Sequence, residues 1–287
     1  IKLSKQAMVN SAIRTGDFFD VQIGDTALHC LPTDFIAGKM MLVRAMILGL
    51  SLDLVKPTAN PMRDLNNTYD FVAMTPMQAH NSIEKLDQIK TLIIGGAPIY
   101  PELIDKLVYS HNNCYETYGM TETVTHIAAS KLSVPKKPFR ALDGIHLNVD
   151  ADGCLIVEAP DITDQLIHTN DLVEMHDKKT FTYLGRRDNI INSGGIKISP
   201  EVVENKLAHH IQFPFFFYGI PDKILGEKII MVVEGDQGVI KEAEKTISAC
   251  KTIEKYEIPE AIYSVSKILR NNGKFMRGKT VSNLKIT

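Results

Sequence analysis

The chain has 287 residues, long for one domain and comfortable for two, and its 44% apolar content suits a protein with a sizeable core. Its 32 basic and 34 acidic side chains nearly cancel, which argues against a nucleic acid or an anionic membrane as a bulk electrostatic partner. The four cysteines lie far apart without zinc-site spacing, which favours a reducing, cytoplasmic compartment. No apolar run approaches the ~18 residues of a membrane span, and a homo-oligomer stays open.

The first part of the chain alternates short apolar runs with helical patterns. Strands are predicted at residues 26–32, 53–57, 69–76, 89–99 and 113–119, and helices at residues 38–50, 77–86 and 100–110. This alternation predicts a mainly parallel α/β sheet. Ligands of such sheets gather at the carboxyl ends of the strands, where residues 95–97 and 118–122 are expected.

The texture changes after about residue 139. Short strands separated by Asp-Gly and Lys-Lys turns predict antiparallel β structure up to about residue 185. From Asn189 onward the pattern predicts a small α+β unit, in which Ser199-Pro200 caps a helix reaching about Ala208. Its later elements are predicted as strands at 214–222 and 227–235, a helix at 238–251 and a strand at 260–268.

The stretch YGMTET, Tyr118–Thr123, combines an aromatic ring, threonine hydroxyls and one carboxylate. Tyr118 can stack on a flat ring, and Thr121 can donate to a phosphate oxygen. Glu122 offers hard oxygen ligands, which Mg²⁺ takes together with substrate phosphates. The alternative is a polar loop whose threonines cap the next helix. The residue types therefore permit a nucleotide site without requiring one.

Three further motifs suit the same chemistry, and each also has an ordinary explanation. The glycines of IIGGAP, residues 93–98, let a ligand approach the backbone closely, and a tight turn would need them too. Asp171 in HTND can accept both hydroxyls of a ribose, and the arginines of GRRD, residues 185–188, suit ribose or phosphate oxygens. A turn aspartate and a solvated charge cluster are the alternatives. Lys274 in NNGKFMRGK can swing toward a phosphate from a flexible polar segment, or belong to a lysine-rich tail.

The order of these motifs resembles one family. GGAP, YETYGMTET, HTNDLVEM, LGRRDNIINSGGIKISPEVVE and NNGKFMR follow one another as in the adenylate-forming acyl- and aryl-CoA ligases. The resemblance covers essentially the whole chain, and YGMTE together with GRRDNIINSGG is highly specific. LPTDFIAGKMMLVRA together with TYGMTETVTHIA is most similar to the o-succinylbenzoate–CoA ligases of menaquinone synthesis.

The resemblance implies an ATP-dependent ligase that uses Mg²⁺, coenzyme A and a small-molecule carboxylic acid. The acid attacks the α-phosphate of ATP and releases pyrophosphate, and the coenzyme A thiol then takes the acyl group and releases AMP. The implied fold is a large N-terminal α/β domain, residues 1–186, truncated at its start, and a small mobile α+β lid, residues 187–287. The lid rotates about a hinge near Asp188, so that one site hosts two reactions.

Matching the family's motifs assigns roles to single residues. The implied catalytic residues are Thr121 for the phosphate, Glu122 for magnesium, and Lys274, which bridges the acid and the α-phosphate. The other matches are Gly95, Gly96, Ala97, Glu116, Thr117 and Tyr118 for the adenine and acyl-pocket wall, Asp171 and Arg186 for the ribose, Gly194 and Gly195 for the pantetheine path, and Phe35 and His126 for the acyl pocket.

Three departures qualify the resemblance. Asn170 stands where the family has a glycine, and we expect a turn there because asparagine tolerates the left-handed region. The segment before Lys274 lacks the usual proline and is one residue shorter. No phosphate loop precedes the segment IKLSKQAM, so we expect that loop to belong to the intact protein and these 287 residues to adenylate poorly alone.

Two alternatives remain beside the o-succinylbenzoate ligase. One keeps the chemistry and changes the acid to another aryl or acyl carboxylate, because Phe35 and His126 do not define the pocket's specificity. The other is a non-catalytic remnant that binds AMP or an acyl-adenylate, although pure binding would not require Lys274.

Overall fold

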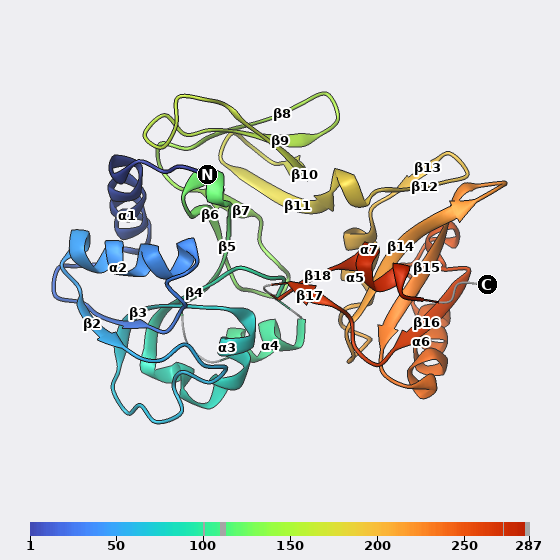
Figure 1. The fold of residues 1–287 in the computed structure, drawn as a ribbon, viewed down its shortest axis with the longest axis horizontal. Coiled ribbons are helices and arrows are strands. Elements are labelled where there is room, and N and C mark those ends of the chain that lie inside the picture. Colours follow the sequence, from blue (N-terminus) through green and yellow to red (C-terminus); the bar gives the residue numbers. More distant parts are fainter. Residues whose placement is uncertain (100, 110–112, 272, 285–287) are drawn as a thin grey trace. The chain divides into compact units, whose positions relative to one another are not determined.

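The computed structural model describes residues 1–99, 101–109, 113–271 and 273–284. The chain divides into two compact units (Figure 1). The first unit contains Ile1–Thr169 and Glu174–Thr182, and the second contains Asn170–Val173 and the residues from Tyr183 onward. The large α/β part with a β-rich segment and the small α+β part confirm the predicted fold class. The predicted boundary at residues 186/187 and the hinge at Asp188 stay predictions.

Five parallel strands form one half of the first unit's sheet, in the order β2-β1-β3-β4-β5. Their bounds are β1 Thr26–His29, β2 Ser51–Leu54, β3 Tyr69–Met74, β4 Ile89–Ile94 and β5 Asn113–Gly119. The inner strands β3 and β4 are covered on both faces, which explains why their sequences are nearly continuous apolar runs. The predicted parallel sheet is confirmed.

Alternate residues of these strands face two separate cores. Leu28 and Leu92 belong to one buried cluster, whereas Ala27, Phe71 and Ile93 belong to another. Side chains of a strand point to opposite faces in turn, so neighbours in sequence enter different cores. A rigid, doubly covered sheet therefore carries the loops at its edge.

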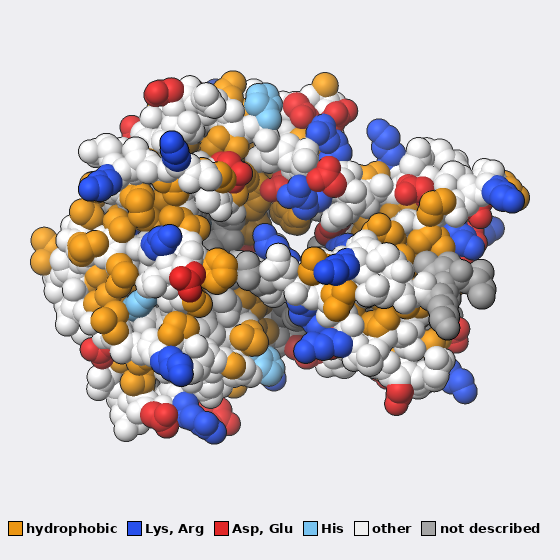
Figure 2. All heavy atoms as spheres, viewed as in Figure 1, with side chains coloured by type: hydrophobic (Ala, Val, Ile, Leu, Met, Phe, Trp, Pro, Cys, Tyr) orange, Lys and Arg blue, Asp and Glu red, His pale blue; other side chains and the backbone are white. Residues whose placement is uncertain are grey.

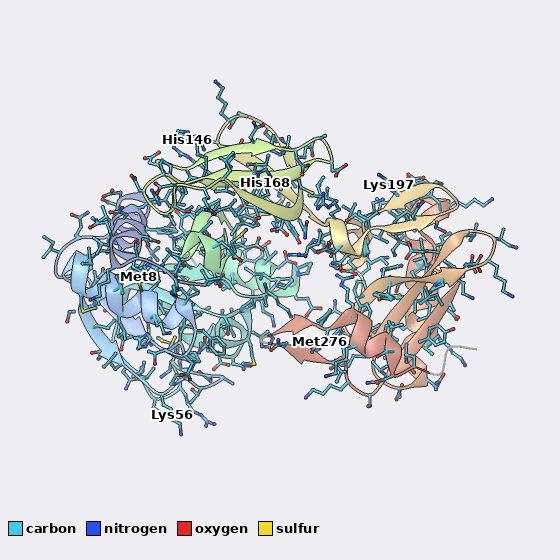
Figure 3. The ribbon with its side chains drawn as sticks, turned by 45° about the horizontal axis from the view of Figure 1, so that its top comes forward. Met8, Lys56, His146, His168, Lys197 and Met276 are labelled. Atoms are coloured by element: carbon cyan, nitrogen blue, oxygen red, sulfur yellow. The ribbon has the colours of Figure 1, made fainter. Side chains whose placement is uncertain are left out.

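The other half of this sheet is antiparallel and continues the order as β5-β6-β7-β11-β10-β9-β8. The strands are β6 His126–Lys131, β7 Phe139–Ala141, β8 His146–Val149, β9 Cys154–Glu158, β10 Ile167–Met175 and β11 Thr180–Arg186. Figure 3 labels His146 in β8 and His168 in β10. The predicted change to antiparallel structure is confirmed, and β10 and β11 carry residues of both units.

The first unit's helices differ from the prediction in two places. The helices are α1 Lys5–Phe19, α2 Ile36–Leu48, α3 Pro76–Asn81 and α4 Pro101–Tyr109, with 3₁₀ turns η1 Ile83–Gln88 and η2 Thr121–Thr123. The sequence interpretation missed α1, whose N-cap Ser4 accepts a hydrogen bond from the Ala7 N–H at 3.0 Å. One helix over residues 77–86 was wrong, because Ser82 leaves the helical conformation and its hydroxyl bonds Asn60. The ends of the predicted helix 100–110 lie outside the described residues.

The second unit contains one five-stranded sheet, with order β13-β12-β15-β14 and β16 paired to β15. Its strands are β12 Ile191–Ser193, β13 Ile196–Ile198, β14 Phe215–Asp222, β15 Gly226–Glu234 and β16 Ala261–Val265, and its helices and 3₁₀ turns include η3 Arg187–Asn189, α5 Pro200–Leu207, α6 Gln237–Ala249 and η4 Lys255–Glu257. Val203 of α5 and Ile247 of α6 share a core with Phe217 of β14 and Met231 of β15.

The segment around Lys274 contains regular secondary structure, which the sequence interpretation did not predict. Two short strands, β17 Arg270–Asn271 and β18 Lys274–Phe275, form a hairpin, and α7 Arg277–Ser282 follows. Gly273 takes a φ of +80° between the strands. The Met276 N–H donates to the Leu269 carbonyl oxygen at 2.8 Å, and Figure 3 labels Met276. Contacts distant in sequence, described below, hold this hairpin.

The surface agrees with the balanced composition. Basic and acidic side chains are interspersed over the face drawn in Figure 2, without a broad region of one sign. None of the described helices is long and apolar enough to cross a membrane.

Candidate functional site

Two motifs meet at one edge of the parallel sheet. Residues 95–97 follow β4, and Glu116–Tyr118 occupy the second half of β5. The two strands are parallel neighbours with Ile94 opposite Glu116, and the Thr117 hydroxyl donates to the Ile94 carbonyl oxygen at 3.1 Å. The strand ends that the sequence placed at one edge do lie together there.

Two glycines are required by close backbone packing in this region. A Cβ at Gly95 would lie 2.5 Å from Thr117 Oγ1. At Gly119 a Cβ would lie 2.3 Å from the Thr125 carbonyl oxygen and 2.5 Å from His126 Cα. Because the second clash is with backbone atoms, a side chain at Gly119 would force β5 and β6 apart. Gly119 thus has a packing reason independent of any ligand.

Tyr118 stands on an aromatic support. Its ring centroid lies 5.2 Å from that of Phe181 in an edge-on contact and 5.9 Å from that of Phe139. Phe139 and Phe181 stack on each other at 5.5 Å and are buried. Edge-on and offset contacts of this kind fix a ring's orientation, so half-buried Tyr118 has a defined plane on which a flat base can stack.

Glu116 already has a cationic neighbour. Lys136 Nζ lies 2.7 Å from Glu116 Oε2, an ion pair, although that buried oxygen has no hydrogen bond of good angular geometry. Lys136 Nζ also lies 5.6 Å from the centre of the Phe139 ring. The sequence interpretation missed Lys136, since nothing in its local pattern indicates a contact with a residue 20 positions earlier.

Thr121 and Glu122 are exposed on the 3₁₀ turn η2 after β5. Thr123, in contrast, is buried, and its hydroxyl bonds the carbonyl oxygens of Met120 and Thr125 at 2.9 and 2.8 Å. The alternative explanation, a threonine that bonds the backbone of its own loop, therefore applies to Thr123. The first two residues of η2 present their hydroxyl and carboxylate to solvent.

A strained turn ends this loop. Val124 has φ 66° and ψ −61°, and the Thr125 N–H donates to the Thr123 carbonyl oxygen at 2.8 Å, which defines a γ-turn. A β-branched residue rarely adopts positive φ. Val124 is fully buried and packs in a cluster with Ala7, Ala12 and Met40, so its side chain anchors the turn to the two helices.

Glu122 fits the implied magnesium ion. Mg²⁺ is usually bound by one or two carboxylates together with substrate phosphates and waters. Across the described residues no cluster of three or more His, Cys, Asp or Glu side chains could hold a metal by itself. A single exposed carboxylate next to the Thr121 hydroxyl agrees with a metal that arrives with a nucleotide.

His126 belongs to a buried polar cluster that the sequence did not reveal. His126 Nε2 lies 3.3 Å from Thr15 Oγ1, which also accepts a hydrogen bond from Arg44 Nε at 3.4 Å. Arg44 is 2% exposed and donates to Thr125 Oγ1 at 3.3 Å. Arg44 forms no ion pair with another residue that the structure describes. The core thus contains a guanidinium held by hydroxyl groups.

Burial sets the ionisation of this cluster. It lowers the pKa of His126 well below the ordinary value, and the nearby positive charge of Arg44 lowers it further. Burial also lowers the pKa of Arg44 to about 10, so the guanidinium stays charged at neutral pH. His126 is consequently a neutral imidazole next to a buried cation. Phe35, at the N-terminus of α2, is 49% exposed, and its role in an acyl pocket stays a prediction.

The second unit contains the predicted ribose pair in a charged cluster. Arg186 donates to Asp171 Oδ1 at 3.4 Å and to Asp188 Oδ2 at 2.9 Å. Asn170 donates to Asp188 Oδ2 at 3.2 Å and accepts from Arg187 at 2.8 Å. The Arg186 guanidinium holds the pKa of Asp188 below its usual value. The structure thus brings together the residues assigned to the ribose and to the hinge.

The turn expected at Asn170 is wrong. Asn170 and Asp171 lie inside β10, and Asn170 is not among the residues with positive φ. The Asn170 side chain is used instead to bridge Asp188 and Arg187. An asparagine at this position therefore joins the charged cluster, which a glycine could not do.

The remaining predicted residues of the second unit are exposed. Gly194 and Gly195 form the turn between β12 and β13 with φ of 59° and 84°, and the Gly194 N–H donates to the Leu225 carbonyl oxygen at 2.8 Å. Such angles favour glycine. Lys274 is exposed at the start of β18. The roles assigned to Gly194, Gly195 and Lys274 stay predictions, because contacts within the second unit do not show what these residues bind.

Two surface hollows, of about 280 and 530 Å³, lie elsewhere in the first unit. The smaller one includes Asn10, Arg14 and Asp161, and the larger one includes Thr26, Asp53 and Tyr69. Neither includes a predicted site residue.

Comparison with curated sequences finds distant relatives. The chain is 24% identical to the 2-succinylbenzoate–CoA ligase of Bacillus cytotoxicus, over 87% of this chain and 60% of that protein. It is also 24% identical to the enzyme of the same name from Geobacillus sp., over 92% and 61%. The chain thus spans about 60% of the length of these curated relatives.

Solved structures give a similar result. An acyl-CoA synthetase (AMP-forming)/AMP-acid ligase II-like protein from Dyadobacter fermentans is 35% identical, with a TM-score of 0.64 over 98% of this chain and 85% of that one. O-succinylbenzoate coenzyme A synthetase from Bacillus subtilis, in complex with ATP and magnesium ion, has a TM-score of 0.84 at 19% identity, over 98% and 66%. At 19% identity, the similarity to the Bacillus subtilis protein shows a shared fold.

The sequence model of one family covers half of the chain. That of the AMP-binding enzymes matches residues 1–144, which include α1, α2, the parallel strands, the glycine turn after β4 and the loop with Thr121 and Glu122. The 35% identity to the Dyadobacter protein extends over both units. The chain belongs to the AMP-binding enzyme family.

Proposed function

We propose that this chain carries the adenylation and thioester chemistry of an AMP-forming acid–CoA ligase, and that its acid is o-succinylbenzoate. The observation that supports the ligase most directly is the loop after β5, where a braced Tyr118 is followed by exposed Thr121 and Glu122 at the carboxyl edge of a parallel sheet. Such edges are where α/β sheets bind nucleotides.

The proposed reaction has two steps. A carboxylate oxygen of the acid attacks the α-phosphorus of ATP, the bond to the β-phosphate oxygen breaks, and pyrophosphate leaves. The thiol sulfur of coenzyme A then attacks the acyl carbon, the bond to the AMP oxygen breaks, and the thiol proton passes to solvent. The products are the acyl-CoA thioester and AMP.

The first unit would bind the nucleotide and the acid. In this proposal the Tyr118 ring stacks on adenine, and the glycines at 95 and 96 let the base approach the backbone. Thr121 donates to a phosphate oxygen, and Glu122 would hold Mg²⁺, which neutralises phosphate charge when bound.

The second unit would supply the ribose contacts and the mobile cation. Asp171 accepts the ribose hydroxyls, with Arg186 fixing the carboxylate. Lys274 places an ammonium group against the charge that develops on the α-phosphate oxygens. Asp188 serves as the hinge, and Gly194 and Gly195 line the path of the pantetheine arm.

The choice of o-succinylbenzoate rests on the names of the relatives and on Arg44. O-succinylbenzoate has a second carboxylate besides the one that reacts. Among the described residues, the Arg44 guanidinium bonds hydroxyl and thioether groups, and such a buried cation can accept this carboxylate with less net cost than a neutral core could. His126, which shares Thr15 with Arg44, lies next to this cation.

Preformed acyl-adenylates test the ligase without depending on pyrophosphate release. Supplied with coenzyme A, the chain should convert o-succinylbenzoyl-adenylate to the thioester faster than the benzoyl or hexanoyl adenylates. ATP–pyrophosphate exchange, which we expect to be slow for these 287 residues alone, should still require Lys274, so Lys274→Ala should lower it at least tenfold while Lys279→Ala does not. AMP binding without thioester formation or exchange would favour the non-catalytic remnant.

Arg44→Gln separates the choice of acid from the reaction type. We expect the KM for o-succinylbenzoyl-adenylate to rise about tenfold or more, because the second carboxylate loses a charged partner. The KM for benzoyl-adenylate should stay the same. Equal effects on both substrates would support an acid without a second carboxylate.

A further inference from the structure

Lys274 lies on a hairpin that is too short to be stable without contacts to the rest of the unit. Its strands contain two residues each, and Gly273 between them takes positive φ. Isolated two-stranded hairpins are marginal even when longer. A lysine that stabilises a transition state must nevertheless be held to within a fraction of an ångström, because small misplacements are costly. Contacts outside the hairpin must therefore order it.

One arginine–glutamate pair holds the strand before Lys274. Arg270 NH1 lies 2.8 Å from Glu234 Oε2 and donates to the Ile268 carbonyl oxygen at 2.8 Å. The same Glu234 oxygen accepts the Ile268 N–H at 2.9 Å. Arg270 also covers the Phe275 ring at 5.1 Å, and so it ties both strands of the hairpin to the end of β15.

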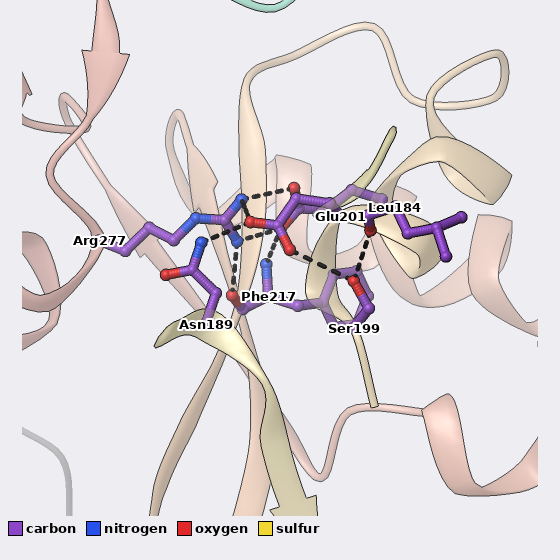
Figure 4. A network of polar contacts seen from close by, with 7 residues as sticks. Leu184, Asn189, Ser199, Glu201, Phe217 and Arg277 are labelled. Carbon is purple, nitrogen blue, oxygen red and sulfur yellow. Dashed lines mark hydrogen bonds and ion pairs between the residues drawn. The ribbon is translucent and has the colours of Figure 1, made fainter. Parts of the chain in front are cut away.

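A second pair holds the residues after Lys274. Arg277 contacts Glu204 through both carboxylate oxygens, with NH2 to Oε2 at 2.8 Å, and donates to the Phe217 carbonyl oxygen at 3.0 Å (Figure 4). Glu204 in turn accepts the Phe217 N–H at 2.8 Å. The side chains of Arg277 and Glu204 are only 14% and 17% exposed, so solvent screens this pair weakly.

The second pair continues toward the predicted hinge. Arg277 NH2 lies 3.4 Å from Glu201 Oε1, and this oxygen also accepts a hydrogen bond from Asn189 at 2.5 Å (Figure 4). Asn189 directly follows Asp188. The contacts therefore connect the segment after Lys274 to the residues next to the hinge, within one unit.

The pairs also keep Lys274 available. Arginines contact Glu234, Glu204 and Glu201, and Lys274 forms no ion pair with another described residue. We propose that Arg270 with Glu234 and Arg277 with Glu204, here called the hairpin clamp, position Lys274 for adenylation while leaving its ammonium group free for the substrate. This inference rests on the proposed function of Lys274.

A double-mutant cycle tests the clamp. Arg270→Gln should lower the rate of ATP–pyrophosphate exchange about tenfold or more, because Lys274 loses its fixed position. Arg270→Gln combined with Lys274→Ala should be no slower than Lys274→Ala alone, since the arginine acts through the lysine. Thioester formation from a supplied acyl-adenylate should change less than about twofold.

Two further measurements separate positioning from stability. Lys206→Gln breaks the 2.7 Å pair with Glu257, remote in sequence from the hairpin, and serves as the matched control. Hydrogen exchange at the Met276 N–H, which bonds Leu269, should speed up in Arg270→Gln but not in Lys206→Gln. Glu234→Gln and Arg277→Lys probe the same clamp, so the test survives if one variant fails to fold.

The outcomes distinguish this inference from the proposed function. If Lys274→Ala leaves exchange unchanged, the assignment of Lys274 fails. If Lys274→Ala abolishes exchange while Arg270→Gln behaves like Lys206→Gln, the clamp is overturned and the function stands. The clamp would likewise be overturned if Arg270→Gln slowed both half-reactions equally, or if it left hydrogen exchange at the Met276 N–H unchanged.

Discussion

The loop after β5 and the charged cluster around Arg186 hold their functional groups by different means. In the loop, glycine contacts, the γ-turn at Val124 and an aromatic support define the backbone, and Thr121 and Glu122 stay exposed. In the cluster, side-chain ion pairs define the geometry, and Arg186 bonds two carboxylates.

The difference has a physical reason. Backbone packing in a doubly covered sheet leaves few alternatives, so groups on it can face solvent without a partner. Ion pairs can break and re-form at modest cost, especially when exposed. We therefore expect changes in the first region to be severe and structural, and changes in the second to act mainly on ligand affinity.

The largest effect should come from Gly119→Ala. Its Cβ would meet two backbone atoms of the next strand at 2.3 and 2.5 Å, which neither strand can avoid. We expect the free energy of unfolding to fall by about 3 kcal/mol, measured by urea denaturation. Gly278→Ala, whose Cβ would meet only the Tyr218 hydroxyl at 3.3 Å, should change stability by less than about 1 kcal/mol. Equal losses would show that the backbone clash at Gly119 is not the cause of the loss.

Arg186→Gln should act on nucleotide affinity more than on stability. Asp171 would lose its contact with the guanidinium, and if Asp171 binds the ribose as proposed, AMP should bind about ten to a hundred times more weakly by calorimetry. Its neighbour Arg187, to which the family resemblance assigns no role, provides the control. Arg187→Gln should weaken AMP binding less than about threefold, and a larger effect would mean that general positive charge attracts AMP.

His126 should make stability depend on pH. Its pKa is depressed in the folded protein, so its contribution is present above the ordinary value of 6.5 and is lost as pH falls. Between about pH 6.5 and 5, we expect wild type to lose up to about 1.4 kcal/mol per pH unit more than His126→Gln. Exposed His146→Gln is the control. Parallel curves for wild type and His126→Gln would show that burial does not depress the His126 pKa.

The smallest effect concerns Ser199, which the sequence assigned to a helix cap. It occupies the N-cap position of α5, but its hydroxyl makes no cap bond and instead donates to the Leu184 carbonyl oxygen at 2.8 Å. Ser199→Ala should therefore cost about 1 kcal/mol by leaving that half-buried carbonyl without this donor. Exposed Ser282→Ala should cost less than about 0.5 kcal/mol, because water replaces its bond. Equal values would show that the Leu184 contact contributes little.

Much of the fold could be read from local pattern. The apolar runs at β3 and β4 predicted strands within a few residues of their bounds, because strands buried on both faces need continuous apolar sequence. Glycine and threonine at the strand ends located the candidate nucleotide loop, because these residue types also form a short local pattern. The helix over residues 77–86 failed because Ser82 bonds a residue 22 positions earlier, which no local pattern records.

The missed site residues share that cause. Arg44 meets Thr125 across 81 residues, Lys136 meets Glu116 across 20, and Arg277 meets Glu204 across 73. Each is an unremarkable charge in its own segment. Only chain folding brings a guanidinium or an ammonium group against a particular acceptor.

The sequence alone determined the alternation of strands and helices, the motifs at the strand ends and the family to which they point, because these depend on residue type and short spacing. The tertiary structure decided that Asn170 joins a charged cluster, that Arg44 is a buried cation beside His126, and that two arginines hold the Lys274 hairpin. Such contacts depend on distances between segments that are remote in sequence, and burial then sets the strength of the electrostatic interaction between the charges.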